Sequence, residues 1–233
     1  PATPSERPCL YIPHAFTDEE LARFFVECDK HVLASRKHNN TLYTRLNQLE
    51  LPVYFRLLFS TGMRTHEARH LKRTDVDLTD GIIEINETKG YDQHRVALHS
   101  SLVELLKRYD ECMALVMPNR QMFFPDADDG PHRPHWAEYH FRQIWVKVSS
   151  EPARPYDMRS HYAVVNITGW KGLGYGVHDK LLYLSRTMGH RSLSSTYWYF
   201  TLSPGLADKI RQCSEESFNG LLPKLDDYEE ENE

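Results

Sequence analysis

Two tyrosine hydroxyls stand close together in the segment MGHRSLSSTYWYF, residues 188–200. Tyr197 and Tyr199 follow His190 by seven and nine residues. A phenolic hydroxyl can act as a nucleophile when neighbouring groups activate it. Two positions on an α-helix differ by about 200° of rotation, so the two rings would point in nearly opposite directions. At most one ring can therefore reach a given site, and the other is expected to pack, with Trp198 on a third face.

Side chains that could bind a phosphate occur in three other short motifs. Arg64 ends TGMR, Lys89 lies in ETKG between two β-rich runs, and Arg159 lies in YDMRSHYAVV. Two guanidinium groups can hold the non-bridging oxygens of a phosphodiester in a fork geometry that a lysine cannot copy. Such a pair would stabilise the negative charge that spreads over these oxygens when a nucleophile attacks the phosphorus.

Taken in order, these motifs resemble the signatures of the tyrosine recombinases, the phage-integrase family. TGMRTHEARHLKRTDVDL (61–78) is similar to the first signature, YDMRSHYAVV to the H-x-x-R box, and LSRTMGHRSLSSTYWYF to the last box. The resemblance runs from about residue 13 to residue 205 and is closest to integrases of conjugative transposons. It implies a tyrosine recombinase/integrase catalytic core.

The resemblance gives each matched residue a catalytic role. Arg64 and Arg159 would clamp the non-bridging oxygens, and His190 would hydrogen-bond one of them. Lys89 would give a proton to the departing 5′ oxygen as a general acid. Tyr199 would attack and hold the 3′ end of the DNA as a phosphotyrosine, so that neither a cofactor nor a metal ion is required.

Three further residues complete the predicted site. Glu67, one helical turn after the first arginine, is expected to orient the catalytic groups, although it could be an ordinary helix carboxylate. Tyr156 stands where the family usually has histidine. A phenol can donate a hydrogen bond to a phosphate oxygen but is a poor proton acceptor at neutral pH. Ser160 follows Arg159 where the family often has histidine, and His161, one position later, is a second expected supporting residue.

The elements that must position these residues are mostly helices. Thr17 with Glu20 forms a capping box ahead of apolar residues at helical spacing. Two β-rich runs, 82–88 and 94–98, flank a turn-like segment and predict a hairpin. Further helices are predicted at 51–60, after Gly62, and at 100–116, 135–149, 156–168, 178–189 and 203–217. The chain is therefore expected to be mainly α with a small antiparallel β-sheet (α+β).

Composition divides the chain into four parts. Residues 1–13 hold four prolines and read as a linker, 14–202 as the catalytic domain, and 203–225 as a C-terminal helix and tail for protomer contacts. Residues 226–233 read as an acidic disordered tail that carries six of the 33 acidic residues. The remaining 27 acidic residues face 28 basic ones, and a body so near neutrality neither excludes nor supports nucleic-acid binding.

Several classes of protein and site are excluded or disfavoured. No apolar run approaches the ~18 residues of a membrane helix, and there is no signal-peptide pattern. The four cysteines form no CxxC pair, which favours reduced thiols. His132, His135 and His140 lack paired cysteines and an HExxH frame, so no metal site is predicted. The glycines of 169–177 follow a helix rather than a strand, which argues against a dinucleotide site. The chain begins at Pro1 rather than Met and reads as a fragment or a processed chain.

The sequence therefore predicts a site-specific DNA recombinase of the bacterial cytoplasm that integrates and excises a mobile element. Its expected partners are double-stranded DNA attachment sites and other copies of itself in a DNA-bound tetramer, without a small-molecule cofactor or a membrane. Three alternatives stay open: a non-catalytic DNA-binding relative in which Tyr156 marks lost chemistry, a type IB topoisomerase, and a helical interaction protein. Exchange of strands between partner DNAs, rather than simple relaxation, distinguishes a recombinase from a topoisomerase.

Overall fold

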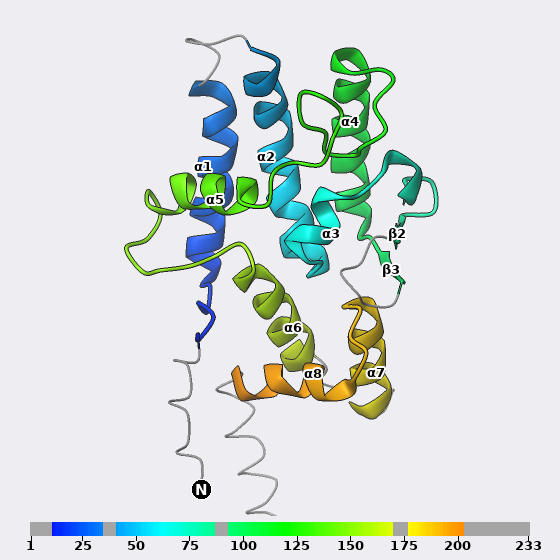
Figure 1. Ribbon diagram of the computed structural model, residues 1–233. Coiled ribbons are helices and arrows are strands. Elements are labelled where there is room, and N and C mark those ends of the chain that lie inside the picture. Colours follow the sequence, from blue (N-terminus) through cyan, green and yellow to red (C-terminus); the bar gives the residue numbers. More distant parts are fainter. Residues whose placement is uncertain (1–10, 35–40, 87–92, 170–176, 203–233) are drawn as a thin grey trace, which may run out of the picture.

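Helices dominate the computed structural model, which describes residues 11–34, 41–86, 93–169 and 177–202 (Figure 1). The elements of these segments, in chain order, are α1 (Asp18–Ala34), α2 (Leu42–Thr61), α3 (Thr65–Arg69), the 3-10 helix η2 (Arg73–Asp75), β1 (Val76–Asp77), β2 (Ile82–Ile85), β3 (His94–Ala97), α4 (Ser100–Val116), α5 (Trp136–Trp145), α6 (Asp157–Gly169), α7 (Val177–Thr187), α8 (Leu193–Tyr197) and the 3-10 helix η3 (Trp198–Leu202). The described part of the chain is mainly α with one small sheet, as predicted. None of its helices is both long and apolar enough to cross a membrane.

The main core lies around α2, which contacts α1, α4 and α6 (Figure 1). Aromatic rings fill it: Phe24 packs on Phe55 and Phe141, with ring centroids 5.4 and 4.9 Å away. Tyr54 is also fully buried, and its hydroxyl donates a hydrogen bond to the carbonyl of Thr65 at the start of α3. The buried helix α2 thereby fixes the start of the helix that follows it.

The sheet is antiparallel with strand order β1-β2-β3. Ile82 pairs with Ala97 and Ile85 with His94, so Ile83 and Val96 lie opposite each other on the core side. The sequence predicted the β2–β3 hairpin, and the structure adds β1 as a third strand of two residues. Residues 87–92, between β2 and β3, lie outside the described segments, and with them the predicted general acid Lys89.

A second, smaller core joins the C-terminal elements. Ala163 and Ile167 of α6 pack with Leu184 of α7, Met188 and Tyr199 of η3. In Figure 1 these helices lie at one end of the molecule, and α6 connects them to α2. The residues of the last predicted signature are therefore held by packing against α6, which carries the second predicted arginine.

Two helix boundaries differ from the predictions by more than two residues. The second helix begins at Leu42 instead of 51, with Pro52 inside it, because Thr41 caps the helix and its hydroxyl accepts the N–H of Thr44. Pro52 removes one backbone hydrogen bond, but the residues around it are buried in the core, and this packing outweighs the loss. Helix α5 ends at Trp145 rather than at 149. The predicted helix at 203–217 and the parts 1–10 and 203–233 lie outside the described residues.

Candidate active site

The first arginine lies at a sharp turn between α2 and α3. Gly62 ends α2 in the left-handed conformation, with φ of +63°, and its N–H binds the carbonyl of Leu58. A Cβ atom at Gly62 would lie 2.4 Å from the ring of Tyr162, so this position requires glycine both for its conformation and for space. The turn places Arg64 at the N-cap of α3.

Arg64 is held by a carboxylate from its own helix. Glu67 Oε2 accepts the backbone N–H of Arg64 at 2.7 Å, and Oε1 accepts Nη1 of the same residue at 2.6 Å. The side chain of Glu67 is 1% exposed, so this pair is largely shielded from water. Nη2 of Arg64 donates to the carbonyl of Gly189 at 3.2 Å, which ties α3 to the α7–α8 turn.

The second arginine, Arg159 of α6, is 1% exposed. Its Nη1 donates to the carbonyl of Gly62, and its Nη2 to the carbonyl of Met188, both at 2.6 Å. Nη2 also contacts Nε2 of His190 at 2.9 Å. Within the described residues Arg159 forms no ion pair with a carboxylate, and its buried Nε has no hydrogen-bond partner. A buried charge without a counter-charge is costly, so this arrangement favours binding of an anion.

His190 lies between the arginine and the predicted nucleophile. Because Arg159 is a donor only, Nε2 accepts its hydrogen, and Nδ1 then carries the proton and donates to Oγ1 of Thr196 at 2.7 Å. Burial, together with the charges of Arg159 and Arg64 and the nearby His94, lowers the pKa of His190 to about 3. The imidazole is therefore neutral at physiological pH in the absence of bound phosphate.

The two tyrosines point apart, as the helix geometry predicted. Tyr199 is 3% exposed and Tyr197 is 51% exposed. The ring of Tyr199 stacks parallel to that of His190, with centroids 6.0 Å apart and an angle of 11° between the planes. Burial raises the pKa of Tyr199, and the neighbouring Arg159 partly opposes that rise. Of the two hydroxyls, only that of Tyr199 therefore lies with the arginines, and it is protonated at neutral pH.

Two other predicted site residues, Tyr156 and His161, do not join the arginines, His190 and Tyr199 through any hydrogen bond among the described residues. Tyr156, just before α6, is 47% exposed, but it is close enough to raise the pKa of Tyr199, although less than burial does. His161 stacks on Phe59 at 5.5 Å and lies edge-on to Phe16 at 6.0 Å. No hydrogen bond in the described segments joins His161 to the two arginines, because two helix positions turn its ring away from Arg159.

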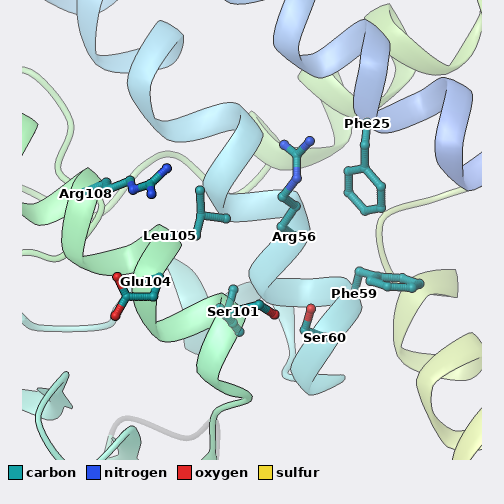
Figure 2. Close-up of a pocket in the computed structure, with 9 residues that line it drawn as sticks. Phe25, Arg56, Phe59, Ser60, Ser101, Glu104, Leu105 and Arg108 are labelled. Carbon is teal, nitrogen blue, oxygen red and sulfur yellow. The ribbon is translucent and has the colours of Figure 1, made fainter.

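A separate cavity of about 550 Å³ lies between α1, α2 and α4 (Figure 2). Phe25, Phe59 and Leu105 form apolar parts of its wall, and Arg56 and Arg108 contribute charges. None of the predicted site residues lines this cavity. The candidate active site is instead the buried group formed by Arg64, Glu67, Arg159, His190 and Tyr199.

The structure adds residues to this group that the motifs did not reveal. Thr196 is fully buried and fixes the His190 ring, and the carbonyls of Gly62, Met188 and Gly189 orient the two guanidinium groups. The role of a backbone carbonyl cannot be read from a sequence. The glycines Gly62 and Gly189, however, are a visible signal of the two turns that present these carbonyls. Gly189 has φ of +61°, and a Cβ there would lie 2.6 Å from the ring of His94.

Comparison with known proteins agrees with this geometry. Residues 17–204 match the phage integrase family. The integrase/recombinase y4rE of Sinorhizobium fredii (strain NBRC 101917 / NGR234) is 28% identical over 178 residues, which are 74% of this chain and 56% of that protein. This chain thus spans little more than half the length of that relative.

Solved structures share the fold at low sequence identity. The XerH site-specific recombinase bound to its difH substrate has a TM-score of 0.64 and 20% identity, over 88% of this chain and 53% of that one. The Tn1549 transposon integrase bound to a circular intermediate DNA has a TM-score of 0.58 and 14% identity, over 82% of this chain and 62% of that one. With most of its length matched to the family, this chain is a member of the phage integrase family, the tyrosine recombinases.

Proposed function

We propose that this chain catalyses the strand cleavage and rejoining of a site-specific DNA recombinase, through a covalent bond between Tyr199 and the 3′ end of the cut strand. Membership of the phage integrase family supports this reaction class. The observation that carries the proposal is the buried Arg159, which has no ion pair to a carboxylate among the described residues and lies with Arg64, His190 and Tyr199. A phosphodiester would supply the missing negative charge.

In the proposed reaction, the oxygen of Tyr199 attacks the phosphorus, and the bond between phosphorus and the 5′ oxygen breaks. The phenol of Tyr199 releases its proton to solvent, and the departing 5′ oxygen takes up a proton from Lys89. The role of Lys89 as this acid is assigned by family resemblance. The phosphodiester becomes a phosphotyrosine ester without net hydrolysis, so a 5′ hydroxyl of another strand can reverse the step and rejoin the DNA.

The two arginines would stabilise the charge on the non-bridging oxygens. Arg64 is already oriented before DNA binds, because its backbone N–H and its Nη1 both donate hydrogen bonds to the carboxylate of Glu67. The neutral His190 can donate from Nε2 to a phosphate oxygen only if the proton on Nδ1 moves or a second proton is bound. Thr196 permits the first change, because its hydroxyl can accept from Nδ1 or donate to it.

The partners of the whole protein are also part of the proposal. XerH and the Tn1549 integrase were solved with DNA bound, which supports double-stranded DNA as the substrate of this chain. The matched transposon integrase favours integration and excision of a mobile element. Other copies of the chain in a DNA-bound tetramer, with residues 203–225 between protomers, and action in the bacterial cytoplasm follow from the family resemblance.

The test uses a nicked suicide DNA whose sequence is selected from a random pool for binding to this chain, and which traps the covalent intermediate. The wild-type chain should form a protein–DNA adduct that survives denaturing electrophoresis, and Tyr199→Phe, which keeps the ring, should fold but form none. A wild-type chain that binds the DNA yet never forms an adduct would favour the non-catalytic alternative.

A further inference from the structure

A cluster of polar contacts fastens the first described residues to the start of α6. The hydroxyl of Tyr11 donates to Oδ2 of Asp157 at 2.6 Å, across 146 positions of the chain. The guanidinium carbon of Arg154 lies 3.9 Å from the centre of the Tyr11 ring. Tyr11 therefore contacts both ends of the turn 154–157, which leads into α6.

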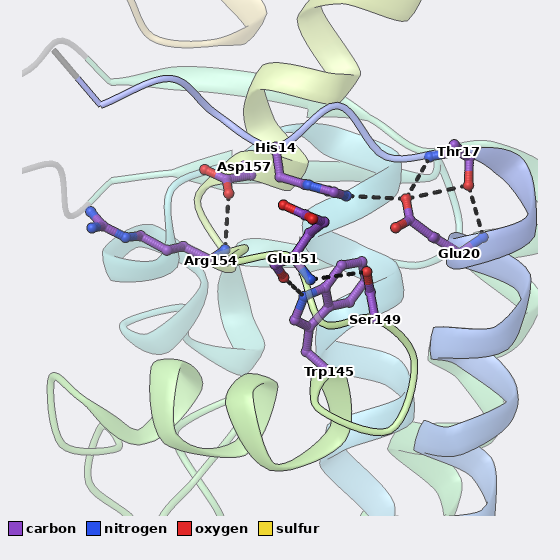
Figure 3. Close-up of polar contacts among 8 residues, drawn as sticks. All are labelled: His14, Thr17, Glu20, Trp145, Ser149, Glu151, Arg154 and Asp157. Atoms are coloured by element: carbon purple, nitrogen blue, oxygen red, sulfur yellow. Dashed lines mark hydrogen bonds and ion pairs between the residues drawn. The ribbon is translucent and has the colours of Figure 1, made fainter.

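Asp157 is the residue on which this cluster converges. Its side chain is fully buried, and Oδ2 also accepts the backbone N–H of Arg154 at 2.9 Å (Figure 3). Its other oxygen, Oδ1, is buried without a hydrogen-bond partner. A buried carboxylate needs donors to offset its lost hydration, so each of the two bonds to Oδ2 matters to the conformation of the turn.

The segment that carries Tyr11 is anchored a second time, at His14. Nε2 of His14 lies 3.0 Å from Oε2 of Glu20, and its ring lies edge-on to Trp145 with centroids 5.2 Å apart (Figure 3). Glu20 in turn accepts the backbone N–H of Thr17 at the start of α1. The segment that carries Tyr11 is therefore held to the body of the domain at two points, through Tyr11 at Asp157 and through His14 at Glu20 and Trp145.

The turn leads directly to two predicted catalytic residues. Tyr156 lies within it, and the carbonyl of Tyr156 accepts the backbone N–H of Arg159 at 3.1 Å. A change in the turn would therefore move the exposed ring of Tyr156 and the backbone that carries the buried guanidinium of Arg159. Burial and the neighbouring Asp157 raise the pKa of Tyr11, so its hydroxyl remains a donor throughout the neutral range.

We propose that Tyr11 is a positioning residue for strand cleavage, because its hydroxyl bond to Asp157 fixes the turn that places Tyr156 and Arg159. The proposal rests on the proposed function, since it assigns Tyr11 to that same site. Tyr11 touches neither the reacting phosphate group nor the nucleophile, and it acts through Asp157. It also links the path of the chain before α1 to the geometry of the active site.

The test compares Tyr11→Phe with the matched control Tyr43→Phe. Tyr43 is similarly exposed, at 48% against 37% for Tyr11. Its hydroxyl lies 3.4 Å from Nε2 of His140, which is not one of the candidate active-site residues. Single-turnover adduct formation on saturating suicide DNA should slow about 10-fold in Tyr11→Phe, as expected for a small displacement of catalytic groups. DNA affinity should stay near the wild-type value. The melting temperature of Tyr11→Phe should fall because the buried Asp157 loses a donor, but its cleavage should remain slow when assayed well below that temperature, and Tyr43→Phe should cleave normally.

Two further measurements separate positioning from general stability. Hydrogen exchange of the amides of 157–160 should be faster in Tyr11→Phe and unchanged in Tyr43→Phe. If Tyr11 acts through Asp157, Tyr11→Phe should slow cleavage less when Asp157→Asn is already present, because the two changes affect one interaction. Fully additive losses would overturn the proposed route through Asp157.

The outcomes also distinguish this proposal from the proposed function. Failure of the wild-type chain to form any adduct would overturn the proposed function itself. A wild-type adduct with an unchanged rate in Tyr11→Phe would overturn only the positioning role. A cleavage rate that returns to the wild-type value when the assay is run well below the melting temperature would likewise overturn it, since Tyr11 would then merely stabilise the fold.

Discussion

The two arginines of the site are held by different kinds of group. Arg64 is paired with the buried carboxylate of Glu67, whereas Arg159 is held by the carbonyls of Gly62 and Met188 and by the neutral His190. Carbonyl dipoles orient a guanidinium without cancelling its charge. The net positive charge of the site is therefore concentrated on Arg159, which we expect to be the more sensitive of the two to a change in geometry.

The first prediction concerns Arg159→Lys, which keeps the charge but loses the planar fork. A lysine cannot donate to both carbonyls and a phosphate oxygen in the same directions, so single-turnover cleavage should fall by about 100-fold or more. The control is Arg56→Lys, because Arg56 makes a bidentate pair with Asp29 at 2.9 and 2.8 Å on the protein surface. Full cleavage by Arg159→Lys would show that charge alone suffices.

The second prediction concerns acid stability. The pKa of His190 is lowered to about 3, mainly by burial and further by Arg159 and Arg64, against ~6.5 in an unfolded chain. Unfolding therefore binds a proton between these values, so stability is lost as the pH falls below ~6.5 towards the folded pKa.

The urea midpoint of the wild-type chain should consequently drop between about pH 7 and about pH 4.5, and that of His190→Gln should drop less. The drop in urea midpoint of the wild-type chain is compared with the drop in His190→Gln, because other groups, including His161 with its lowered pKa, titrate in both proteins. Equal drops in both proteins would mean that His190 is not held neutral in the fold.

The motifs predicted the side chains of the candidate site but not the groups that hold them. Arg64, Arg159, His190 and Tyr199 come from three separate signatures, and the described structure brings them together around one point. The carbonyls and Thr196 could not be predicted, because their role depends on how α2, α6 and α7 meet. Lys89 lies outside the described residues, and its role stays a prediction.

At the scale of elements, two left-handed glycine turns build the site. Gly62 ends α2 and Gly189 follows α7, and each offers its carbonyl to the arginine of another element. Both turns leave no room for a side chain, since the rings of Tyr162 and His94 cover them. Each turn therefore has two roles: it reverses the chain after a helix, and its carbonyl orients a guanidinium group.

The third prediction compares Gly189→Ala with Gly81→Ala. Both glycines have a left-handed backbone conformation, with φ of +61° at Gly189 and +67° at Gly81. Alanine at either position should therefore lower the free energy of unfolding by about 1–2 kcal/mol. At Gly81 the new Cβ would lie 3.2 Å from a methyl group of Val103, away from the site, whereas at Gly189 it would displace His94.

We therefore expect both alanine variants to melt at lower temperature, but only Gly189→Ala to lose adduct formation when assayed well below its melting temperature. Thermal unfolding and single-turnover cleavage measure the two effects separately. Normal cleavage by a folded Gly189→Ala protein would contradict the role given to this turn.

The same scale shows where periodicity predicts elements and where it does not. The hairpin and the helices α1, α4, α6 and α7 lie close to their predicted ranges, because their patterns are regular. Helix α2 begins nine residues before the predicted range 51–60, since the burial of its first turns cannot be seen in the sequence. The strand β1 has only two residues and exists through pairing with β2, so the periodicity of its own residues does not predict it.

At the scale of the whole molecule, residues 1–225 carry 28 basic and 27 acidic residues, so their net charge adds little to the attraction of the chain for DNA, and local phosphate contacts must supply it. The fourth prediction is that this chain binds DNA weakly and that its affinity falls steeply as salt rises, because phosphate contacts carry most of the affinity. Binding titrations over a range of salt concentrations measure the slope. Tight binding that is insensitive to salt would point to contacts other than those with the phosphates.

The central claim is that Tyr199, and not Tyr197, forms the covalent bond with DNA. The claim rests on the burial of Tyr199 beside His190 and the arginines, while Tyr197 points outward with half its side chain exposed. Proteolysis of the trapped adduct followed by mass spectrometry identifies the modified residue. We predict that the nucleotide is attached to Tyr199 and that Tyr197→Phe still forms the adduct, whereas DNA attached to Tyr197, or an adduct that persists in Tyr199→Phe, would contradict the assignment.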